Sequence, residues 1–294
     1  MQYKTLSNWF LLILIALIWG SSYILIKVSL LVFSPVQVAM IRLTLSGLVL
    51  LPFFYRYIKG TSKIIWGWCL LLGLSAFFIP HLSFAFAQTV ISSSLAGMLN
   101  SLQPLFTLVV GIFLFKHHIP RHQVFGVLIG FAGAIILLGA KSSVASYTDN
   151  FLFSLLVVLA TFCYGIAANI IRLHLKDVSP LKITTLSLGI FIIPCSLILF
   201  NTDVISRIGP EPQIIKALYS LAILAIFGTS ISVILYNKLI KEGGMMMAST
   251  VAYLIPVVAI IWGVFDGELI NLAHIIGICV IFTGLYLINQ RQGK

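Results

Sequence analysis

The chain has 294 residues, of which 60% are hydrophobic and only 9% are charged, and its mean hydropathy is +1.13. Soluble domains carry roughly 25% charged residues, so this composition excludes a protein whose whole surface faces water. Lipid must surround most of the molecule, and its long uninterrupted apolar runs predict spanning helices rather than the alternating strands of a barrel.

The apolar runs follow one another along the whole chain, separated by short polar or turn segments. A span needs about 20 apolar residues, and we expect ten: 9–31, 35–55, 65–87, 92–115, 121–140, 151–173, 179–200, 214–238, 245–265 and 270–289. The first run imitates a secretory signal peptide behind Lys4, but it is too long for the apolar part of one, so we interpret it as a retained span. The sequence therefore predicts an all-α polytopic membrane protein with ten transmembrane helices.

Basic residues indicate which side of the membrane each connection faces, because cytoplasmic loops carry an excess of Lys and Arg. With a cytoplasmic N-terminus, the external loops hold only Lys141, Arg207 and Lys216. The cytoplasmic segments hold Lys4, Arg56, Lys59, Lys63, Lys116, Arg121, Arg172, Lys176, Lys182, Lys238, Lys241, Arg291 and Lys294. This asymmetry predicts a bacterial-type inner (plasma) membrane protein with both termini in the cytoplasm.

The net charge of +11 is spread over short clusters between spans, so it does not indicate nucleic-acid binding.

The two halves of the chain resemble each other. We expect residues 1–140 to form one five-helix repeat and residues 151–294 a second, joined by a linker at 141–150. Five is an odd number, so the second repeat would cross the membrane in the opposite orientation, as in transporters that bind substrate between inverted repeats. The matches fall at offsets of 145, 152 and 151: Trp19-Gly20 with Tyr164-Gly165, Lys27 with Arg172, Ser34-Pro35 with Ser179-Pro180; Phe84 with Tyr236, Ala96 with Ala248, Leu102 with Leu254, Pro104 with Pro256, Gly111 with Gly263; and Gly126 and Gly133 with Gly277 and Gly284.

The segment from Trp19 to Tyr23, with Lys27, Pro35 and Arg42, resembles the opening of EamA-type members of the drug/metabolite transporter superfamily. The ends of the two family repeats resemble the runs Ala96…Pro104…Gly111 and Ala248…Pro256…Gly263…Glu268. The resemblance covers nearly the whole chain. It implies ten spans, a central cavity lined largely by spans 3, 4, 8 and 9, and transport of amino acids, nucleotide sugars, sugar phosphates or other metabolites. One position departs from the family, because Lys116 replaces the acidic residue that Glu268 keeps in the second repeat.

Polar and aromatic residues occur at helical spacing in the spans expected around this cavity, and polar side chains at depth usually turn inward. Hydrogen bonding between helices, worth only about 0.6 kcal/mol on average, would explain any single one of them. The set together favours a substrate site. We expect the substrate-binding residues to be His81, Phe84, Asn100, Gln103, Tyr236, Asn237 and Tyr253.

Further candidates concern charge, gating and helix breaks. Lys27 and Arg42 are cations inside predicted spans, where they either anchor the helices at the external interface or attract an anionic substrate. Trp19 and Trp262 are candidates for closing the ends of the cavity, although aromatic residues in spans more often face lipid or the core. Pro104 and Pro256 occupy matched positions. Each frees a backbone carbonyl four residues earlier, and a cavity can satisfy it.

These features predict a transporter that moves small organic metabolites, such as amino acids or related anionic or zwitterionic compounds, as an exporter or exchanger by alternating access. An intramembrane enzyme is one alternative, but it needs a nucleophile–base pair, a carboxylate dyad or a metal site at depth, and no Asp or Glu lies deep in a predicted span. A non-transporting receptor or assembly factor is another, and the inverted repeat argues against it.

Single cysteines in apolar runs predict no metal site and no disulfide, and no cofactor is expected. The expected partners are the substrate and the lipid bilayer, and the chain is expected to be a monomer or a weak homodimer.

Overall fold

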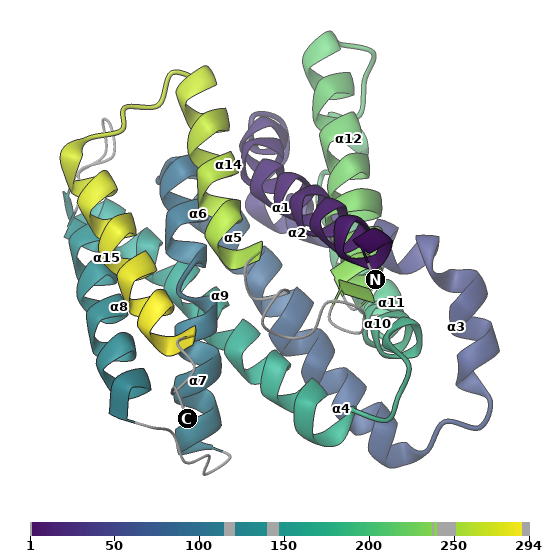
Figure 1. Ribbon diagram of the computed structural model, residues 1–294. Helices are drawn as coiled ribbons and strands as arrows, with labels where there is room; N and C mark the ends of the chain where they lie inside the picture. The colour runs from purple at the N-terminus through teal and green to yellow at the C-terminus, as the bar shows by residue number, and fades with distance from the viewer. Residues whose placement is uncertain (1, 115–120, 140–146, 237, 240–250, 290–294) are drawn as a thin grey trace.

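The computed structural model describes residues 2–114, 121–139, 147–236, 238–239 and 251–289, and every regular element within them is a helix (Figure 1). The prediction of an all-α protein is confirmed. The α-helices are α1 (Gln2–Leu30), α2 (Pro35–Val49), α3 (Leu51–Ile58), α4 (Lys63–Gly73), α5 (Ile79–Ala87), α6 (Ser93–Asn100), α7 (Gln103–Phe113), α8 (Arg121–Gly139), α9 (Tyr147–His174), α10 (Pro180–Gly189), α11 (Ile192–Phe200), α12 (Pro212–Ala225), α14 (Val251–Phe265) and α15 (Leu272–Asn289). Two π-helices, η1 (Leu74–Phe78) and η3 (Ile226–Ile231), and one 3₁₀-helix, η2 (Ile205–Arg207), complete the described elements.

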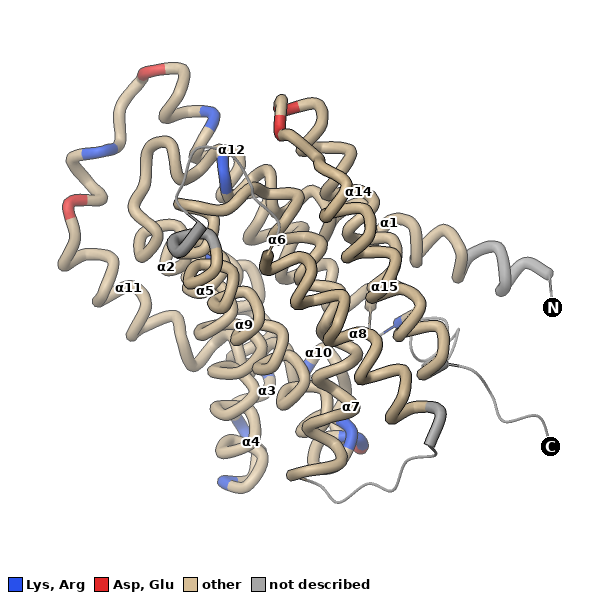
Figure 2. Tube along the Cα trace, turned by 90° about the vertical axis from the view of Figure 1, so that its left-hand side faces the viewer, with Lys and Arg blue, Asp and Glu red and all other residues tan. Residues whose placement is uncertain are grey.

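The surface of the bundle is that of a membrane protein. Within the described residues, six helical segments have the length and composition of membrane spans, or seven if the bent pair α2–α3 is one span. Most charged residues lie near the two ends of the bundle (Figure 2). Between these ends large apolar side chains point outward, among them Phe113 and Ile135, which are 78% and 70% exposed. A surface of this kind needs lipid around it. The ten-span interpretation stays a prediction, because α14, α15 and the described part of α8 are shorter apolar helices.

Prolines determine where two of the predicted spans are interrupted. α2 and α3 are bent by 64° at a break next to Leu50, two residues before Pro52. α6 ends at Asn100, and α7 begins just before Pro104. Because proline has no N–H for the carbonyl four residues back, the helix loses a hydrogen bond at each place. Pro256 was predicted as the match of Pro104, but it lies inside α14, which continues past it unbroken.

The internal repeat has counterparts in local structure at the positions that the sequence offsets predict. Ser34 and Ser179 cap the N-termini of α2 and α10, and in both helices a proline is the first residue. The π-helices η1 and η3 begin at Leu74 and Ile226, which are 152 positions apart. Corresponding helices therefore begin and distort in the same way, which supports a duplicated unit.

Contacts between the repeats also occur as equivalent pairs. Gly20 of α1 packs on Val258 of α14, with so little room that a Cβ on this glycine would lie 2.5 Å from the valine Cβ. Gly165 of α9 packs on Phe106 of α7, where a Cβ would lie 2.7 Å from the backbone carbonyl carbon. These two contacts correspond to each other under the offsets of 145 and 152. The first helix of each repeat is thus seated against the fourth segment of the other.

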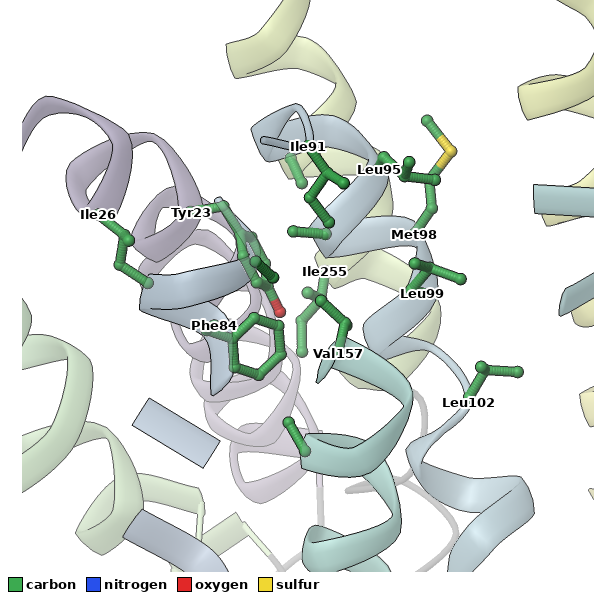
Figure 3. Close-up of a cluster of buried hydrophobic side chains, with 14 of the residues drawn as sticks. Tyr23, Ile26, Phe84, Ile91, Leu95, Met98, Leu99, Leu102, Val157 and Ile255 are labelled. Atoms are coloured by element: carbon green, nitrogen blue, oxygen red, sulfur yellow. The ribbon is translucent and has the colours of Figure 1, made fainter. Parts of the chain in front are cut away.

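The largest buried cluster joins helices from both repeats (Figure 3). Tyr23 of α1 and Phe84 of α5 point toward each other, with 5.6 Å between the ring centroids. Ile255 of α14 and Val157 of α9 belong to the same cluster. The apolar core therefore holds the repeats together at the level where these four helices meet.

Glycines also set the packing of α8 on α15, which run side by side along one edge of the bundle (Figure 1). A Cβ at Gly126 would lie 2.7 Å from the carbonyl oxygen of Gly284, and one at Gly133 would lie 2.8 Å from that of Gly277. Small residues allow helix backbones to approach this closely in lipid. Because Gly126 matches Gly277 and Gly133 matches Gly284, this contact also maps onto itself when the repeats are exchanged.

We expect Gly133→Ala to lower the thermal stability of the purified protein, because its Cβ would lie 2.7 Å from the backbone nitrogen of Ile281. Overpacking of this kind costs about 1–3 kcal/mol. Gly67→Ala is the matched control, since nothing lies within 4 Å of its Cβ position, and alanine's better helix propensity should keep or raise stability. Melting curves in detergent compare the two; equal melting temperatures would contradict the packing of α8 on α15.

Candidate functional site

A cavity of about 490 Å³ lies between the repeats, within the range of about 300–1,000 Å³ typical of small-molecule sites. It is lined by α1, α2, η1 and α5 and by the break between α6 and α7 on the first repeat's side. α9, α10, η3 and the residues that follow η3 line it on the second repeat's side. Most of the wall is apolar or aromatic, and a small number of polar groups converge on it.

Two aromatic pairs occupy equivalent places on the cavity wall. The ring centroids of Trp19 and Tyr236 are 5.1 Å apart, and those of Tyr164 and Phe84 are 6.4 Å apart. Trp19 corresponds to Tyr164, and Phe84 to Tyr236, so each pair takes one ring from each repeat. Trp19 also donates from Nε1 to the hydroxyl of Ser232 at 2.8 Å, which orients its ring.

The polar groups of the wall are distributed unequally between the repeats. Tyr23 and His81 line the cavity, whereas Ala168 and Val233 line it at the corresponding positions of the second repeat. Thr229 is the opposite case, because its counterpart in η1 is a phenylalanine. The shape of the site is thus shared between the repeats, while the polar groups that each repeat contributes are different.

Arg42 of α2 is the buried charge of the site, with only 8% of the residue exposed. Its Nε donates to Thr229 Oγ1 at 3.0 Å, and the threonine hydroxyl in turn donates to the carbonyl of Leu224 at 3.0 Å. The π-helix η3 places the threonine there, and π-helical distortions are frequent at functional sites. No carboxylate of the described residues lies within ion-pair distance of the guanidinium.

Two buried polar atoms of the wall have no hydrogen-bond partner among the described residues. They are Nδ1 of His81 and Oδ1 of Asn100, on side chains that are 5% and 7% exposed. An unsatisfied buried polar atom costs about 1–3 kcal/mol. A ligand that donates hydrogen bonds would remove this cost at the asparagine oxygen.

Among the described residues of the cavity wall, only Arg172 and Lys176 are exposed. Both lie near the C-terminus of α9, and they mark the mouth of the cavity. Their counterparts in the first repeat, Lys27 and Leu31, are not part of the cavity wall. The structure therefore represents a conformation that is open at the Arg172 end and closed at the Lys27 end.

A network of charged and polar groups joins three segments at the closed end. Nζ of Lys27 donates to Asp266 at 2.5 Å and to Glu268 at 3.0 Å. Oε1 of Glu268 accepts from the backbone N–H of Ser93 at 2.8 Å and from its hydroxyl at 2.6 Å. Oε2 accepts from the N–H and hydroxyl of Ser94 at 2.9 and 2.6 Å. The second repeat thereby caps the N-terminus of α6 in the first.

The surroundings of Glu268 keep it ionised. Burial alone would raise the pKa of this carboxyl group, but the hydrogen bonds from Ser93 and Ser94 outweigh burial and lower its pKa to about 2. The partial positive charge of a helix N-terminus favours the anion in the same way.

Seven of the residues singled out from the sequence line the cavity: Trp19, Arg42, His81, Phe84, Asn100, Gln103 and Tyr236. Asn237 lies outside the described residues. Tyr253, Pro104 and Pro256 are not on the wall, and the Tyr253 ring packs on Phe282 of α15 instead. Lys27 is held by two carboxylates, and Trp262 is 43% exposed and donates to Ser21 at 2.7 Å. That the lining residues bind a substrate stays a prediction.

Sequence reasoning missed two tyrosines of the wall as binding candidates, Tyr23 and Tyr164. A signal for the second was present, because the internal repeat matches it to Trp19. Tyr23 offers no such signal, since its counterpart is Ala168. Hydropathy does not distinguish the inward face of a spanning helix from its lipid face, so contacts were needed to place it.

A bundle of membrane-length helices with an internal repeat around a cavity open at one end has the architecture of a membrane transporter. The model of the EamA-like transporter family matches the chain twice, over residues 7–139 and 152–290. The chain belongs to the EamA-like transporter family, as its sequence resemblance implied, and it is therefore an integral membrane transporter rather than an enzyme.

Full-length relatives and a solved structure are consistent with this membership. An uncharacterized transporter of Archaeoglobus fulgidus is 24% identical, and the comparison covers 98% of this chain and all of the relative. A probable amino-acid metabolite efflux pump of Salmonella typhimurium is 24% identical over 95% of this chain and 93% of the relative. A crystal structure titled only as that of a protein superposes with a TM-score of 0.65, covering 96% of both chains at 17% identity. It supports the fold alone.

The depressed pKa of Glu268 predicts how stability depends on pH. Its contribution is fully present above its ordinary pKa of 4.5 and is lost as pH falls from there toward about 2. We expect the melting temperature of the wild type to decline more steeply below pH 4.5 than that of Glu268→Gln. Removing both hydroxyl donors in Ser93→Ala/Ser94→Ala should raise the folded-state pKa of Glu268 toward 4.5 and therefore make the decline below pH 4.5 shallower. Tryptophan fluorescence melts from pH 3 to 8 measure this, and parallel curves for wild type and Glu268→Gln would contradict it.

Proposed function

We propose that this protein carries small anionic or zwitterionic metabolites, such as amino acids, by alternating access, as an exporter or exchanger in a bacterial-type inner (plasma) membrane. The proposal includes ten spans in two inverted five-helix repeats, residues 1–140 and 151–294, joined by the linker 141–150. The observation that carries it is Arg42, a buried cation on the cavity wall with no carboxylate beside it among the described residues.

A buried cation without a counter-ion is unfavourable in a low-dielectric interior. The Thr229 hydroxyl occupies one guanidinium donor, which leaves the terminal nitrogens to bind an anionic group arriving in the cavity. Guanidinium binds carboxylate or phosphate oxygens in a bidentate manner. The substrate itself would therefore supply the missing negative charge.

The charges of the whole cavity favour the same class of substrate. Arg42 lies at depth, and Arg172 and Lys176 lie at the mouth. No Asp or Glu contributes to the described wall. A cleft lined by one sign of charge concentrates ions of the other sign, so the site should accept anions and zwitterions and reject simple cations.

The unpartnered Oδ1 of Asn100 favours a substrate that also carries an N–H donor. An amide oxygen only accepts hydrogen bonds, and an ammonium group supplies three donors. An amino acid provides a carboxylate and an ammonium group in one molecule. The relatives of Salmonella typhimurium and Escherichia coli named as probable amino-acid metabolite efflux pumps add support for this class.

The inverted arrangement is supported by the equivalent contacts of Gly20 with Val258 and of Gly165 with Phe106. Two similar repeats in opposite orientations provide two conformations of comparable energy, one open to each side. The excess of basic residues favours a cytoplasmic position for the Arg172 end, and in that orientation the conformation described above is the inward-open one. One chain supplies the entire cavity, and a monomer or weak homodimer would therefore suffice.

Transport should follow the substrate's own gradient. Proton coupling usually requires a titratable carboxylate or histidine at depth. Of these residue types, only His81 lines the described cavity. We therefore expect exchange in liposomes without an imposed pH or sodium gradient. Concentrative uptake driven by a proton gradient and retained in His81→Ala would overturn this part of the proposal.

Arg42→Gln should abolish recognition of the carboxylate. The test is exchange in liposomes with three probes. They are leucine, its analogue with a hydroxyl group in place of the amine, and its analogue without the carboxylate. We expect the wild type to prefer leucine, and Arg42→Gln to lose at least about tenfold in apparent affinity for both acids, because charged hydrogen bonds contribute about 1.5–3 kcal/mol each. Asn100→Leu should selectively lose the preference for leucine over the hydroxy acid.

Lys216→Gln is the matched control, since this exposed cation on α12 does not line the cavity. Its transport should equal that of the wild type. Unchanged affinity for acids in a folded Arg42→Gln protein would refute the anion site, and the absence of exchange with any amino acid or organic acid would refute the proposed function.

The proposed orientation is tested by single cysteines at positions 4, 146 and 291. We expect a membrane-impermeant thiol reagent to label position 146 from outside intact cells. Positions 4 and 291 should react only in inside-out vesicles, because both termini are expected in the cytoplasm. External labelling of either terminus would reverse the assignment.

A further inference from the structure

We infer that the network around Glu268 is a latch present at one end of the molecule only, and that it biases the transporter toward the conformation open at the Arg172 end. This inference rests on the proposed alternating-access function. The latch consists of Lys27, Asp266 and Glu268 together with Ser93 and Ser94, the first two residues of α6.

The latch connects segments that must separate before the closed end can open. Lys27 belongs to α1 and the serines to α6, both in the first repeat. The two carboxylates lie in the connection between α14 and α15, in the second repeat. Any opening between the repeats at this end has to break the ion pairs of Lys27 or remove Glu268 from the α6 N-terminus.

Local backbone geometry places both carboxylates at this point. Gly267 has φ +79°, a conformation that favours glycine. It lets the N–H of Glu268 return to the carbonyl of Gly263 at 2.8 Å, which closes the C-terminus of α14. Gly263 is also tightly placed, since a Cβ there would contact the Ser94 hydroxyl and the Glu268 carboxylate. Two glycines thus permit the approach on which the latch depends.

The helices next to the latch are also closely packed along α14. Gly97 of α6 faces Ala259 of α14, where a Cβ on the glycine would contact the alanine Cβ. Gly20 of α1 faces Val258 on the same helix. α14 is therefore seated against both α1 and α6, and the latch holds these three helices together at their outer end.

The positions equivalent to those of the latch carry residue types that cannot form a second one. Under the offsets of 145 and 152, Lys27 corresponds to Arg172 and Glu268 to Lys116. Two cations cannot form the ion pair. Ser93 and Ser94 correspond to Met245 and Met246, which have no hydroxyl. This step uses residue identities only, because Lys116 and the methionines lie outside the described residues.

The consequence is an unequal equilibrium between the two access states. Exchanging the conformations of the repeats would break the six hydrogen bonds that hold the two carboxylates at one end, including both ion pairs of Lys27. The equivalent positions at the other end could not form the same set. A two-state equilibrium shifts by the difference in interaction free energy between the states. The inward-open state should therefore dominate, and opening at the latch should limit the rate of exchange.

The test follows the accessibility of one cavity residue from each side. Ser22 lines the cavity on α1, and Ser22→Cys provides the reporter in a protein whose four native cysteines are replaced by serine. An impermeant maleimide is applied to intact cells and to inside-out vesicles. In the otherwise unchanged protein we expect fast labelling from the cytoplasmic side and slow labelling from outside.

Glu268→Gln should raise the external labelling rate by at least about tenfold and lower the cytoplasmic rate, because a population shift changes both in opposite directions. Lys27→Gln should act in the same direction and serves as a second variant if the first does not fold. Glu211→Gln is the matched control, since it removes an exposed carboxylate just before α12 whose side chain does not cap the helix, and it should change neither rate.

Rates within twofold of the reporter protein in both folded latch variants would overturn the latch. A rise in labelling from both sides would also overturn it, because that result indicates loosening rather than a shift between states. The labelling needs no substrate, so these outcomes are distinct from the absence of exchange in liposomes, which would refute the proposed function instead.

Discussion

The contact of α1 with α14 and its equivalent, α9 with α7, is the constraint on which the rest of the structure depends. Lipid provides no hydrophobic driving force between helices, so association in a membrane relies on close packing and on hydrogen bonds. Gly20 and Gly165 provide that packing at corresponding positions. Because each contact joins one repeat to the other, the cavity has to form between the repeats, and corresponding aromatic residues such as Trp19 and Tyr164 both reach its wall.

The repeats have diverged in chemistry while they kept their packing. Several packing residues match across the repeats, such as Gly20 with Gly165 and Trp19 with Tyr164, but most polar side chains do not. Tyr23 corresponds to Ala168, His81 to Val233 and Glu268 to Lys116. A shared backbone is what the proposed alternating access requires, because it allows two similar conformations. The divergent side chains place different polar groups on the two sides of the cavity and different residues at the two ends of the bundle. The proposed substrate site and the proposed latch both rest on this loss of symmetry.

The sequence predicted features that depend on local rules or on the repeat, and it failed where contacts between distant segments decide. Helix positions, the break before Pro104 and the inward placement of Arg42, His81 and Asn100 could all be predicted from hydropathy, proline chemistry and polar residues at depth. The orientation of Tyr253 could not, because a spanning helix is apolar on its lipid face and on its packed face alike. The partners of Lys27 lie more than 200 positions away, and no local pattern indicates them.

Lys27 and Arg42 were equivalent candidates in the sequence, and their surroundings separate them. Lys27 has two carboxylates within 3.0 Å, so its charge is already balanced and serves to hold helices together. Arg42 is more deeply buried, and in the described residues the one hydrogen bond of its guanidinium is to a threonine hydroxyl. A protein carboxylate beside Arg42 would stabilise the fold, but it would also compete with an anionic substrate for the guanidinium. Leaving that charge unbalanced lowers stability and keeps the binding energy for the ligand. Two cations in spanning helices therefore differ in role: the paired Lys27 holds helices together, and the unpaired Arg42 is the residue we propose to bind the substrate.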